Sequence, residues 1–429
     1  MFKEFRITNY KSINQEQIFT MEACPHNEVS EHEDHVVEIN GQRILKVASL
    51  YGPNGGGKTN LLTAILLFKG LVFGSKPQIY NTDNNSYINS VYAADNVTKF
   101  EMFVVNQSFE IGYSLHVDLN SQIDDTEPTF IPLQKIIKPI IKYEELIYRV
   151  KDTDEFIALY TRDESGEISS DILNDLEIIK NNSKLSEQKT FLIYLVEAFS
   201  NNGSSMFTLG PVFSFYNELL NISAVGRDPS LMIYNASTKN KIEPNLPRIV
   251  KTLNKVGINI KKLFFKQLYI DNSYVLYAER DDTNGGSKYM PISSESRGTN
   301  KLVDLLISLY DQTDHRPSVF LIDDFDAALH PKLVNAILEL FTSKYNKWHQ
   351  LIFNSHDMVN MNNKVFRRDE IWFAYKNEDN STIYLPLSNI RNYKGEMVRK
   401  DAKYGKQYLE GRYGADPFVE KGLHWEDRF

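Results

Sequence analysis

Hydrophobic and polar positions change their period along this 429-residue chain, and the changes predict its elements. Where the two kinds of residue alternate, a strand buries one face and exposes the other. Alternation of this kind covers residues 2–7, 99–119 and 140–150. From about residue 152 to 265 the apolar residues mostly have helical spacing. Strand pattern then returns at 263–280.

Short, continuous apolar runs mark a second kind of unit. They predict strands buried on both faces at 44–51, 318–322 and 350–356. Amphipathic helical patterns lie beside these runs in sequence, at 60–67, 301–310 and 332–341. Buried strands alternating with helices predict an α/β fold. No heptad pattern persists through three or four repeats, so we expect no long coiled coil.

Composition narrows the class of protein. Apolar residues make up 42% of the chain, but no apolar run reaches the ~18–20 residues that a membrane span needs. The N-terminal residues lack the apolar core of a signal peptide, and the single cysteine, Cys24, excludes an intrachain disulfide. We therefore expect a cytoplasmic protein without a membrane segment. A net charge of −8 argues against a surface coated in nucleic acid.

A polar segment at residues 24–35 contains His26, His32 and His35. Its composition predicts an exposed loop between two strands. Metal binding by the histidines is the alternative, but their spacing with the carboxylates matches no familiar metal-site pattern. The sequence therefore favours a solvated loop.

The run from Gly52 to Thr59 has the pattern G-x-x-x-x-G-K-[ST] between a predicted strand and a predicted helix. Its glycines let a phosphate reach consecutive backbone N–H groups, and the helix start adds further donors. Lys58 would supply a cation to the β- and γ-phosphates of ATP, and the Thr59 hydroxyl would bind Mg²⁺. The predicted nucleotide-binding residues of this segment are Gly52, Asn54, Gly55, Gly57, Lys58, Thr59 and Asn60.

Two carboxylates, Asp323 and Asp324, follow the predicted strand at 318–322. A strand that ends in aspartate beside a P-loop is the Walker B arrangement. Asp323 would then hold Mg²⁺ through its hydration shell, and Asp324 would polarise the attacking water. The pattern alone has little specificity, because many buried strands end in an aspartate turn.

Three further segments give this pattern its context. Asp326 begins the run D-A-A-L-H-P directly after the two carboxylates, and the predicted strand at 350–356 ends in His356. Upstream, Ser296 and Gly298 lie at the start of a predicted helix, whose free N–H groups form a second phosphate-binding end. Two such ends far apart in sequence predict one nucleotide held between two copies of the chain.

In this order the motifs resemble the SMC/RecF-like branch of ABC-type ATPases, with Walker A, an E-S-x-G-T signature, Walker B, a D-loop and an H-loop. More narrowly, the chain is similar to standalone bacterial RloA/AbiL-type ATPases of phage defence, to which the AriA component of PARIS is related. Three segments outside the motifs also match that family's pattern: F-R-I-T-N-Y-K-S-I at 5–13, Y-E-E-L at 143–146 and the tail at 407–417. The resemblance spans nearly the whole chain and is least specific in the helical middle.

The resemblance implies an ABC-type ATPase head, in which an antiparallel sheet lies beside a P-loop core sheet. Its parts would be a first lobe at 1–150, a helical insertion at 151–265 and a second lobe at 266–429. It also implies roles for residues outside the P-loop. Ser296 and Gly298 would cap the γ-phosphate bound by the partner copy, and His356 would contact the γ-phosphate of its own copy. Asp326 would lie in the dimer-facing loop, and Lys11 and Ser12 would approach the nucleotide from the N-terminal sheet.

The function that the resemblance implies is an ATP-dependent sensor or scaffold of an anti-phage, abortive-infection system. It would act as a homodimer or higher homo-oligomer and control a separately encoded effector, such as a toprim-type nuclease, because the chain has no recognisable nuclease residues.

One departure from the family pattern affects the expected rate of ATP hydrolysis: Asp324 stands where the family usually has Glu. The shorter side chain moves the carboxylate by roughly 1.5 Å. A misplacement of about 1 Å can lower a reaction rate by on the order of 10²-fold, so we expect ATP to bind but to be hydrolysed slowly.

Two other functions stay open on the sequence. One is a RecF-like DNA-repair ATPase that clamps DNA, and the other is a structural subunit that binds nucleotide and barely turns it over. Residues 391–412 have the basic and aromatic texture of a nucleic-acid surface, although a solvated helix face or a protein-binding surface explains them equally well. The residues concerned are Arg391, Tyr393, Lys394, Arg399, Lys400, Lys403, Tyr404, Lys406, Tyr408 and Arg412.

Overall fold

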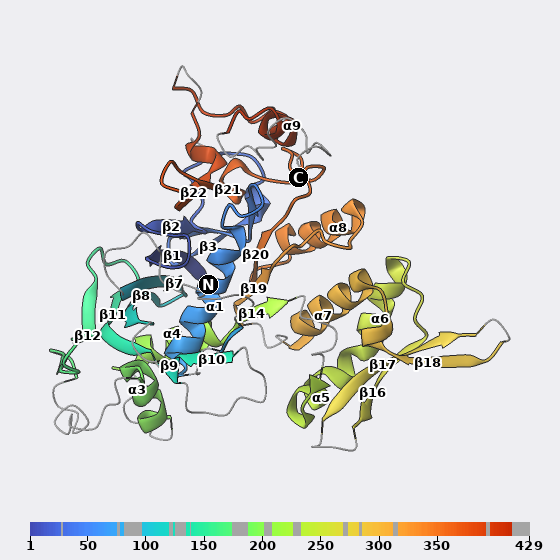
Figure 1. Cartoon of the computed structure of the whole chain (residues 1–429), viewed down its shortest axis with the longest axis horizontal. Coiled ribbons are helices and arrows are strands. Elements are labelled where there is room, and N and C mark those ends of the chain that lie inside the picture. Colours follow the sequence, from blue (N-terminus) through green and yellow to red (C-terminus); the bar gives the residue numbers. More distant parts are fainter. Residues whose placement is uncertain are drawn as a thin grey trace, which may run out of the picture.

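Two large sheets flank the helix that follows the P-loop (Figure 1). The computed structural model describes residues 1–26, 29–74, 78–80, 97–119, 123–124, 134–137, 139–173, 188–200, 208–225, 233–268, 273–282, 285–311, 316–391 and 395–413. In this part of the chain the fold is α/β, as the sequence predicts. The longest described helices have 15 residues each, so the described chain holds no long coiled coil.

The first sheet has seven antiparallel strands in the order β13-β12-β11-β8-β7-β1-β2. They are β1 (Phe2–Thr8), β2 (Gln17–Thr20), β7 (Val97–Val105), β8 (Phe109–Asp118), β11 (Ile140–Val150), β12 (Ile157–Arg162) and β13 (Ile168–Ser169). Their alternating apolar residues face α1 (Lys58–Val72), where Phe68 meets the rings of Phe5, Phe100 and Tyr113 at 5.8–5.9 Å. The alternation therefore predicts both the strands and the face that they bury.

The central sheet has six strands in the order β14-β19-β20-β5-β21-β22. They are β14 (Ile222–Val225), β19 (Ser318–Ile322), β20 (His349–Asn354), β5 (Val47–Tyr51), β21 (Ile371–Lys376) and β22 (Thr382–Pro386). All neighbours are parallel except β21 and β22. Parallel strands end at the same edge, so the loops after β5, β19 and β20 meet there. We call this the carboxyl edge, and the opposite side the amino edge.

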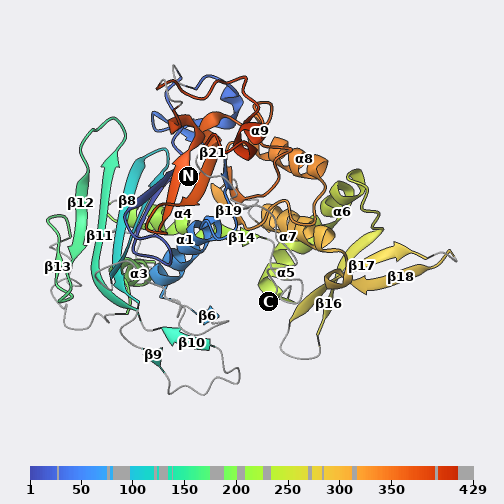
Figure 2. The same cartoon turned by 45° about the horizontal axis from the view of Figure 1, so that its top comes forward.

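The remaining helices and strands lie around these sheets. Figure 2 shows α3 and α4 beside the antiparallel sheet, whereas α5, α6 and the small sheet lie on the far side of the central strands. The helices are α3 (Phe191–Phe199), α4 (Gly210–Leu220), α5 (Ala236–Ile242), α6 (Leu246–Lys255), α7 (Arg297–Asp311), α8 (Pro331–Thr342) and α9 (Tyr404–Leu409). The small sheet contains β15 (Ile233–Tyr234), β16 (Lys262–Gln267), β17 (Tyr274–Asp281) and β18 (Ser287–Pro291). None of the described helices is both long and apolar enough to cross a bilayer.

The predicted strand at 44–51 is two strands. Residues up to Leu45 form β4 (Gln42–Leu45), which pairs with β3 (Val36–Ile39), whereas β5 begins at Val47 and joins the central sheet. Between them, Lys46 is buried and its ammonium donates to the carbonyl of Ser343 at 2.9 Å. A buried lysine needs such acceptors, and a partner 297 positions away leaves no local pattern.

The helical prediction for 152–265 holds for α3, α4, α5 and α6 but misses β12, β13, β14 and β15. Within this range, residues 174–187, 201–207 and 226–232 lie outside the described residues. One buried carboxylate, Glu144 on β11, attaches α3 to the antiparallel sheet. It accepts hydrogen bonds from the Phe191 and Leu192 N–H groups and from the hydroxyls of Tyr113 and Tyr160. The helix start is thus fixed by a strand residue 47 positions earlier.

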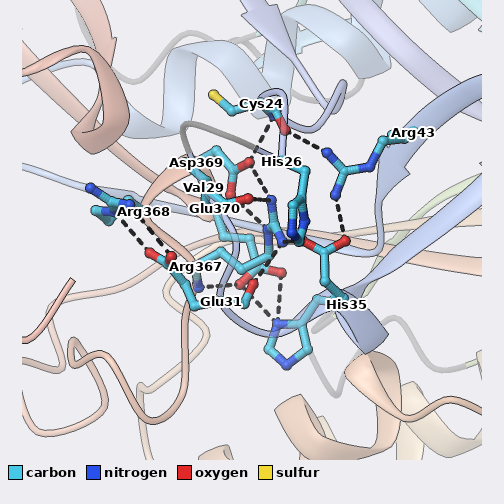
Figure 3. A network of polar contacts seen from close by, with 11 residues as sticks. Cys24, His26, Val29, Glu31, His35, Arg43, Arg367, Arg368, Asp369 and Glu370 are labelled. Carbon is cyan, nitrogen blue, oxygen red and sulfur yellow. Dashed lines mark hydrogen bonds and ion pairs between the residues drawn. The ribbon is translucent and has the colours of Figure 1, made fainter.

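The segment at 24–35 is not the fully exposed loop that its polarity predicts. Arg367 is completely buried beneath it and donates to the Glu31 carbonyl at 2.7 Å, to Glu33 at 3.2 Å and to Asp369 at 2.9 Å (Figure 3). Arg368 adds an ion pair with Glu31 at 2.8 Å. The carboxylates of the loop are therefore partners for buried cations at the amino edge.

Candidate functional site

The P-loop fills the turn between β5 and α1 and lies against the last two strands of the central sheet. A Cβ at Gly52, where φ is +151°, would come within 2.0 Å of the Ala374 carbonyl oxygen on β21. At Gly57, where φ is +103°, it would come within 2.3 Å of the Thr382 hydroxyl on β22. Only glycine fits at either position. Asn54 and Gly55 are exposed, whereas Gly56 is buried.

Lys58 is buried, with 6% of its surface exposed, and its ammonium donates to the carbonyls of Gly52 at 2.9 Å and Pro53 at 3.0 Å. Burial lowers the pKa of Lys58, and the attraction of Asp324 and Asp323 partly opposes this. The cation is therefore retained inside the loop by carbonyl oxygens. A phosphate oxygen carries more negative charge and would be a stronger acceptor at the same place.

Thr59 and Asp323 meet although they are 264 positions apart: the Thr59 hydroxyl donates to the Asp323 carboxylate at 3.0 Å. The Asn354 side-chain amide, at the end of β20, is fully buried beside them. It donates to Asp323 and accepts from the Asp324 N–H at 2.5 Å. A hydroxyl and a carboxylate at one point are the oxygen ligands that Mg²⁺ prefers. The donors present thus fit the predicted metal ion.

Asp324 lies in the left-handed region, with a φ of +48°. Aspartate and asparagine tolerate this conformation better than a longer side chain does. Its carboxylate is exposed, while its carbonyl accepts a hydrogen bond from Lys301 on α7 at 2.5 Å. Burial lowers the pKa of Lys301, against the attraction of Asp324. One lysine thus links α7 to the backbone of the turn after β19.

Asp326, two positions after Asp324 in the same turn, accepts a hydrogen bond from the His356 N–H at 3.0 Å. Phe325, which lies between the two aspartates, donates its N–H to the Asn354 carbonyl at 2.9 Å. Hydrogen bonds therefore join the turn after β19 both to the end of β20 and to the loop that follows it. The side chain of His356 is exposed at the carboxyl edge.

Ser296 directly precedes α7, and its hydroxyl accepts a hydrogen bond from the Thr299 N–H at 3.2 Å, as an N-cap does. Gly298 in the first turn is buried, and a Cβ there would come within 2.4 Å of the Ala328 carbonyl oxygen. The signature segment therefore packs against the turn after β19 of its own chain. Ser296 itself is exposed.

The N-terminal sheet reaches the P-loop through Ser12. Its hydroxyl accepts from the Asn60 side-chain amide at 2.7 Å and contacts the Thr382 hydroxyl at 2.7 Å. Thr382 donates to the Gly56 carbonyl at 3.0 Å. Lys11, which has a φ of +50°, donates to Thr63 on α1 at 3.3 Å. The structure thus places Lys11 and Ser12 beside the P-loop helix, and their approach to a nucleotide stays a prediction.

The basic segment at 391–412 is a weaker nucleic-acid candidate in the structure than in the sequence. Tyr404 and Tyr408 are buried, and Tyr408 stacks on Phe373 at 5.4 Å, so neither ring is free to stack on a base. Arg399 pairs with Asp401 at 2.9 Å. The aromatic part of that prediction is therefore wrong for both tyrosines. Tyr393 and Lys394 lie outside the described residues.

Sequence reasoning missed four residues of this site: Asn354, Lys301, Thr382 and Tyr384. Tyr384 donates its hydroxyl to the Gly57 carbonyl at 2.7 Å, beside the contact that Thr382 makes with the same loop. The sequence does contain a signal for Asn354. A polar residue that ends a buried apolar strand parallel to the Walker B strand lies at the same carboxyl edge of the sheet. Lys301, Thr382 and Tyr384 belong to elements whose neighbours the sequence does not reveal.

The family model that matches this chain is described as "AAA domain, putative AbiEii toxin, Type IV TA system" and covers residues 47–362. No curated protein matches in sequence. Among solved structures, similarity is found to an SMC head bound to the C-winged helix domain of ScpA, with 13% identity, 90% of this chain and 98% of that chain covered, and a TM-score of 0.41. The SMC head domain from Thermotoga maritima has 13% identity, the same two coverages and a TM-score of 0.38. An Smc head with an extended coiled coil, bound to the C-terminal domain of ScpA derived from Pyrococcus furiosus, has 12% identity, coverages of 90% and 96%, and a TM-score of 0.37.

Proposed function

This chain belongs to the AAA-domain ATPase family just described, and we propose that it hydrolyses ATP with Mg²⁺ as the sensor or scaffold of an anti-phage, abortive-infection system. One observation carries the enzymatic part. The P-loop threonine and the first Walker B aspartate are in contact at the carboxyl edge, with Lys58 buried beside them. This is the arrangement that the chemistry of phosphoryl transfer requires.

Each residue of the carboxyl edge has a task in this proposal. Mg²⁺, when bound, would neutralise charge that develops on the phosphates. Thr59 and Asp323 would bind the Mg²⁺ ion, and the Asn354 amide would orient the Asp323 carboxylate by donating a hydrogen bond to it. Lys58 would exchange its two carbonyl partners for phosphate oxygens. Asp324 would orient the attacking water, and the exposed His356 would contact the γ-phosphate.

Two copies of the chain would complete each site. Ser296 is exposed, and its hydroxyl accepts a hydrogen bond from the Thr299 N–H, so its own O–H can still donate. This O–H and the backbone N–H groups of the helix start would bind a partner's γ-phosphate. Gly298 holds this helix start against the turn after β19. Closure on a partner's nucleotide would therefore act on both the signature segment and the Walker B turn.

The test uses two inactive proteins. Lys58→Ala should lack nucleotide binding, and Ser296→Arg should bind nucleotide but fail to hydrolyse it, because its long side chain obstructs the interface. In a mixed dimer one site carries both lesions and the other carries neither. ATPase rate measured against mixing ratio should therefore rise from near zero, pass through a maximum near equal amounts and fall again.

Ser296→Ala is the matched control, because it removes the cap hydroxyl without adding bulk. It should retain most of the activity, while α7 loses about 1 kcal/mol of capping. Strong activity from Ser296→Arg alone would contradict the composite site. A flat line at zero, with heterodimers shown by native mass spectrometry, would contradict independent composite sites.

The cellular role needs a separate experiment, because the family description names a toxin whereas we assign the destructive step to a separate effector. Expression of the chain alone should leave uninfected cells growing. Phage resistance should need both this chain and a neighbouring gene, and it should be lost with Lys58→Ala. Growth arrest by the chain alone would show that it is itself the toxin.

A further inference from the structure

A short 3₁₀ turn in the segment at 24–35 brings two histidines and an aspartate together. The turn spans Glu33–His35, and His32, with a φ of +50°, is its N-cap. A 3₁₀ helix has three residues per turn, so side chains at positions i and i+3 lie over each other. The rings of His32 and His35 accordingly stack, with centroids 4.8 Å apart and planes at 22°. One ligand atom from each histidine and one from Asp34 all lie within 4.8 Å of one another.

Each histidine is already oriented through its other ring nitrogen. The Nδ1 atom of His35 is 3.0 Å from both carboxylate oxygens of Glu370, which is fully buried. The Nε2 atom of His32 is 2.8 Å from the Asn363 carbonyl oxygen. Both acceptors require an N–H at the nitrogen that faces them. With the proton on these nitrogens, a neutral ring has its lone pair on Nε2 of His35 and on Nδ1 of His32.

A histidine whose second nitrogen donates to a carboxylate or a carbonyl is the usual form of a metal ligand, because this contact fixes both tautomer and orientation. Here the two kinds of partner occur on the two neighbouring rings. A histidine that only fills space or caps a turn does not need a buried carboxylate behind it. The contacts with Glu370 and Asn363 are thus evidence separate from the closeness of the three ligand atoms.

The three residues face a cavity of about 460 Å³ at the end of α8. Asp34 and Glu339 contribute negative charge to its lining, and Lys344 and Lys364 contribute positive charge. Both lysines are exposed, and the Lys344 ammonium lies over the Tyr345 ring at 5.3 Å. The cavity therefore has room for an ion and a water ligand, and its flexible cations can turn to solvent.

We propose that His32, Asp34 and His35 bind a Zn²⁺ ion through His32 Nδ1, His35 Nε2 and the Asp34 carboxylate, with water as the fourth ligand. Two imidazoles and one carboxylate suit Zn²⁺, whereas Mg²⁺ prefers oxygen ligands alone. Two contacts place the site at the amino edge. The Lys46 ammonium, directly before β5, donates to the Asp34 carbonyl, and Glu370, directly before β21, contacts His35. The site is therefore distinct from the Mg²⁺ site predicted at the carboxyl edge. All three ligands belong to the segment at 24–35, so the ion would fix the conformation of its 3₁₀ turn, and His35 would connect that turn to Glu370 before β21.

The experiment is a zinc titration of the full chain after removal of metal with a chelator, in competition with a chromophoric chelator. We expect one equivalent of Zn²⁺ to bind with a dissociation constant of micromolar or below and to raise the melting temperature. Cobalt in place of zinc should give the strong visible absorption of a tetrahedral site. His32→Ala and Asp34→Asn should each weaken zinc binding by at least tenfold.

His26→Ala is the matched control, because His26 belongs to the same segment but is exposed, and its ring pairs with Glu33, which is not one of the proposed ligands. It should bind zinc as the unchanged protein does. Glu370→Gln tests the orienting contact and should weaken binding by about 10–100-fold. Because Glu370 is buried, circular dichroism must first show that this variant folds. Absence of a bound equivalent, or equal binding by His32→Ala and Asp34→Asn, would overturn the proposal.

Discussion

Around Arg367, at the amino edge of the central sheet, buried charges form ion pairs, whereas at the carboxyl edge the carboxylates of Asp323 and Asp324 are exposed and could bind a ligand. Arg367 is fully buried and donates to Asp369, Glu33 and two loop carbonyls. Asp323 and Asp324 are exposed, and two of the lysines that they attract, Lys58 and Lys301, donate to backbone carbonyls. Paired charges fix a structure, while charges without an ionic partner can change partners when a ligand arrives.

The carboxyl edge also contains several residues with an unusual backbone conformation. Gly52, Gly57 and Asp324 all have positive φ at the carboxyl edge. Strained positions cluster where a ligand must be approached closely. If this contrast is correct, substitutions at the amino edge should change stability and leave nucleotide binding alone. Substitutions at the carboxyl edge should change nucleotide binding or turnover and have smaller effects on stability.

The largest expected effect on stability is that of Arg367→Met. It removes the cation and leaves the buried carboxylate of Asp369 without its partner, which costs about 3–5 kcal/mol. Urea unfolding followed by circular dichroism measures the loss. Arg399→Met is the control, because the ion pair of Arg399 with Asp401 is exposed and contributes at most about 1 kcal/mol.

Lys58→Ala should have the largest effect on function. ATP affinity should fall by at least about 100-fold, because a charge-assisted contact to the phosphates is lost. The unfolding midpoint should change little, since only two carbonyls of the loop lose a donor. Calorimetric titration with ATP and Mg²⁺ gives the affinity. Unchanged ATP affinity in a folded variant would remove the P-loop assignment.

Asp324 tests the chemistry at the carboxyl edge. Asp324→Asn keeps a side chain that tolerates the positive φ, and it should lower turnover by about tenfold or more while ATP still binds. Asp324→Glu should raise turnover if the short carboxylate limits the reaction. It should also lower stability by about 1–2 kcal/mol, because glutamate is strained in the left-handed region. Equal turnover in all three proteins would mean that Asp324 does not orient the water.

The carboxyl edge was the more predictable of the two from sequence. Lys58 and Thr59 belong to one local pattern, and the turn after β19 carries Asp323 and Asp326 within four positions. Local patterns can be recognised without the fold, because their spacing already places the residues. Their partners Asn354 and Lys301 could not be found in this way, since each depends on which elements the fold brings together.

The amino edge was almost invisible in sequence. The polar residues at 24–35 predict a solvated loop, because nothing near them in sequence indicates a buried partner. That partner, Arg367, contacts Glu31 from 336 positions away. The same holds for Lys46, which split a predicted strand in two. The spacing of apolar residues predicts which faces of strands and helices are buried, but a prediction made from it places every charged residue at the surface. Buried ion networks are therefore the part of this fold that the pattern gets wrong.

The smallest expected effect sharpens the comparison, because it concerns a buried polar residue that belongs to the carboxyl edge. Thr382 is 1% exposed, and its hydroxyl donates to the Gly56 carbonyl and contacts Ser12. Thr382→Val keeps the shape and removes the hydroxyl, which should cost about 1 kcal/mol of stability. Because the P-loop then loses a support from β22, ATP affinity should also weaken several-fold. Thr382→Ser keeps the hydroxyl and is the control. If Thr382→Val lowers stability without changing ATP affinity, the support from β22 is structural only, and the functional part of the carboxyl edge ends at the P-loop itself.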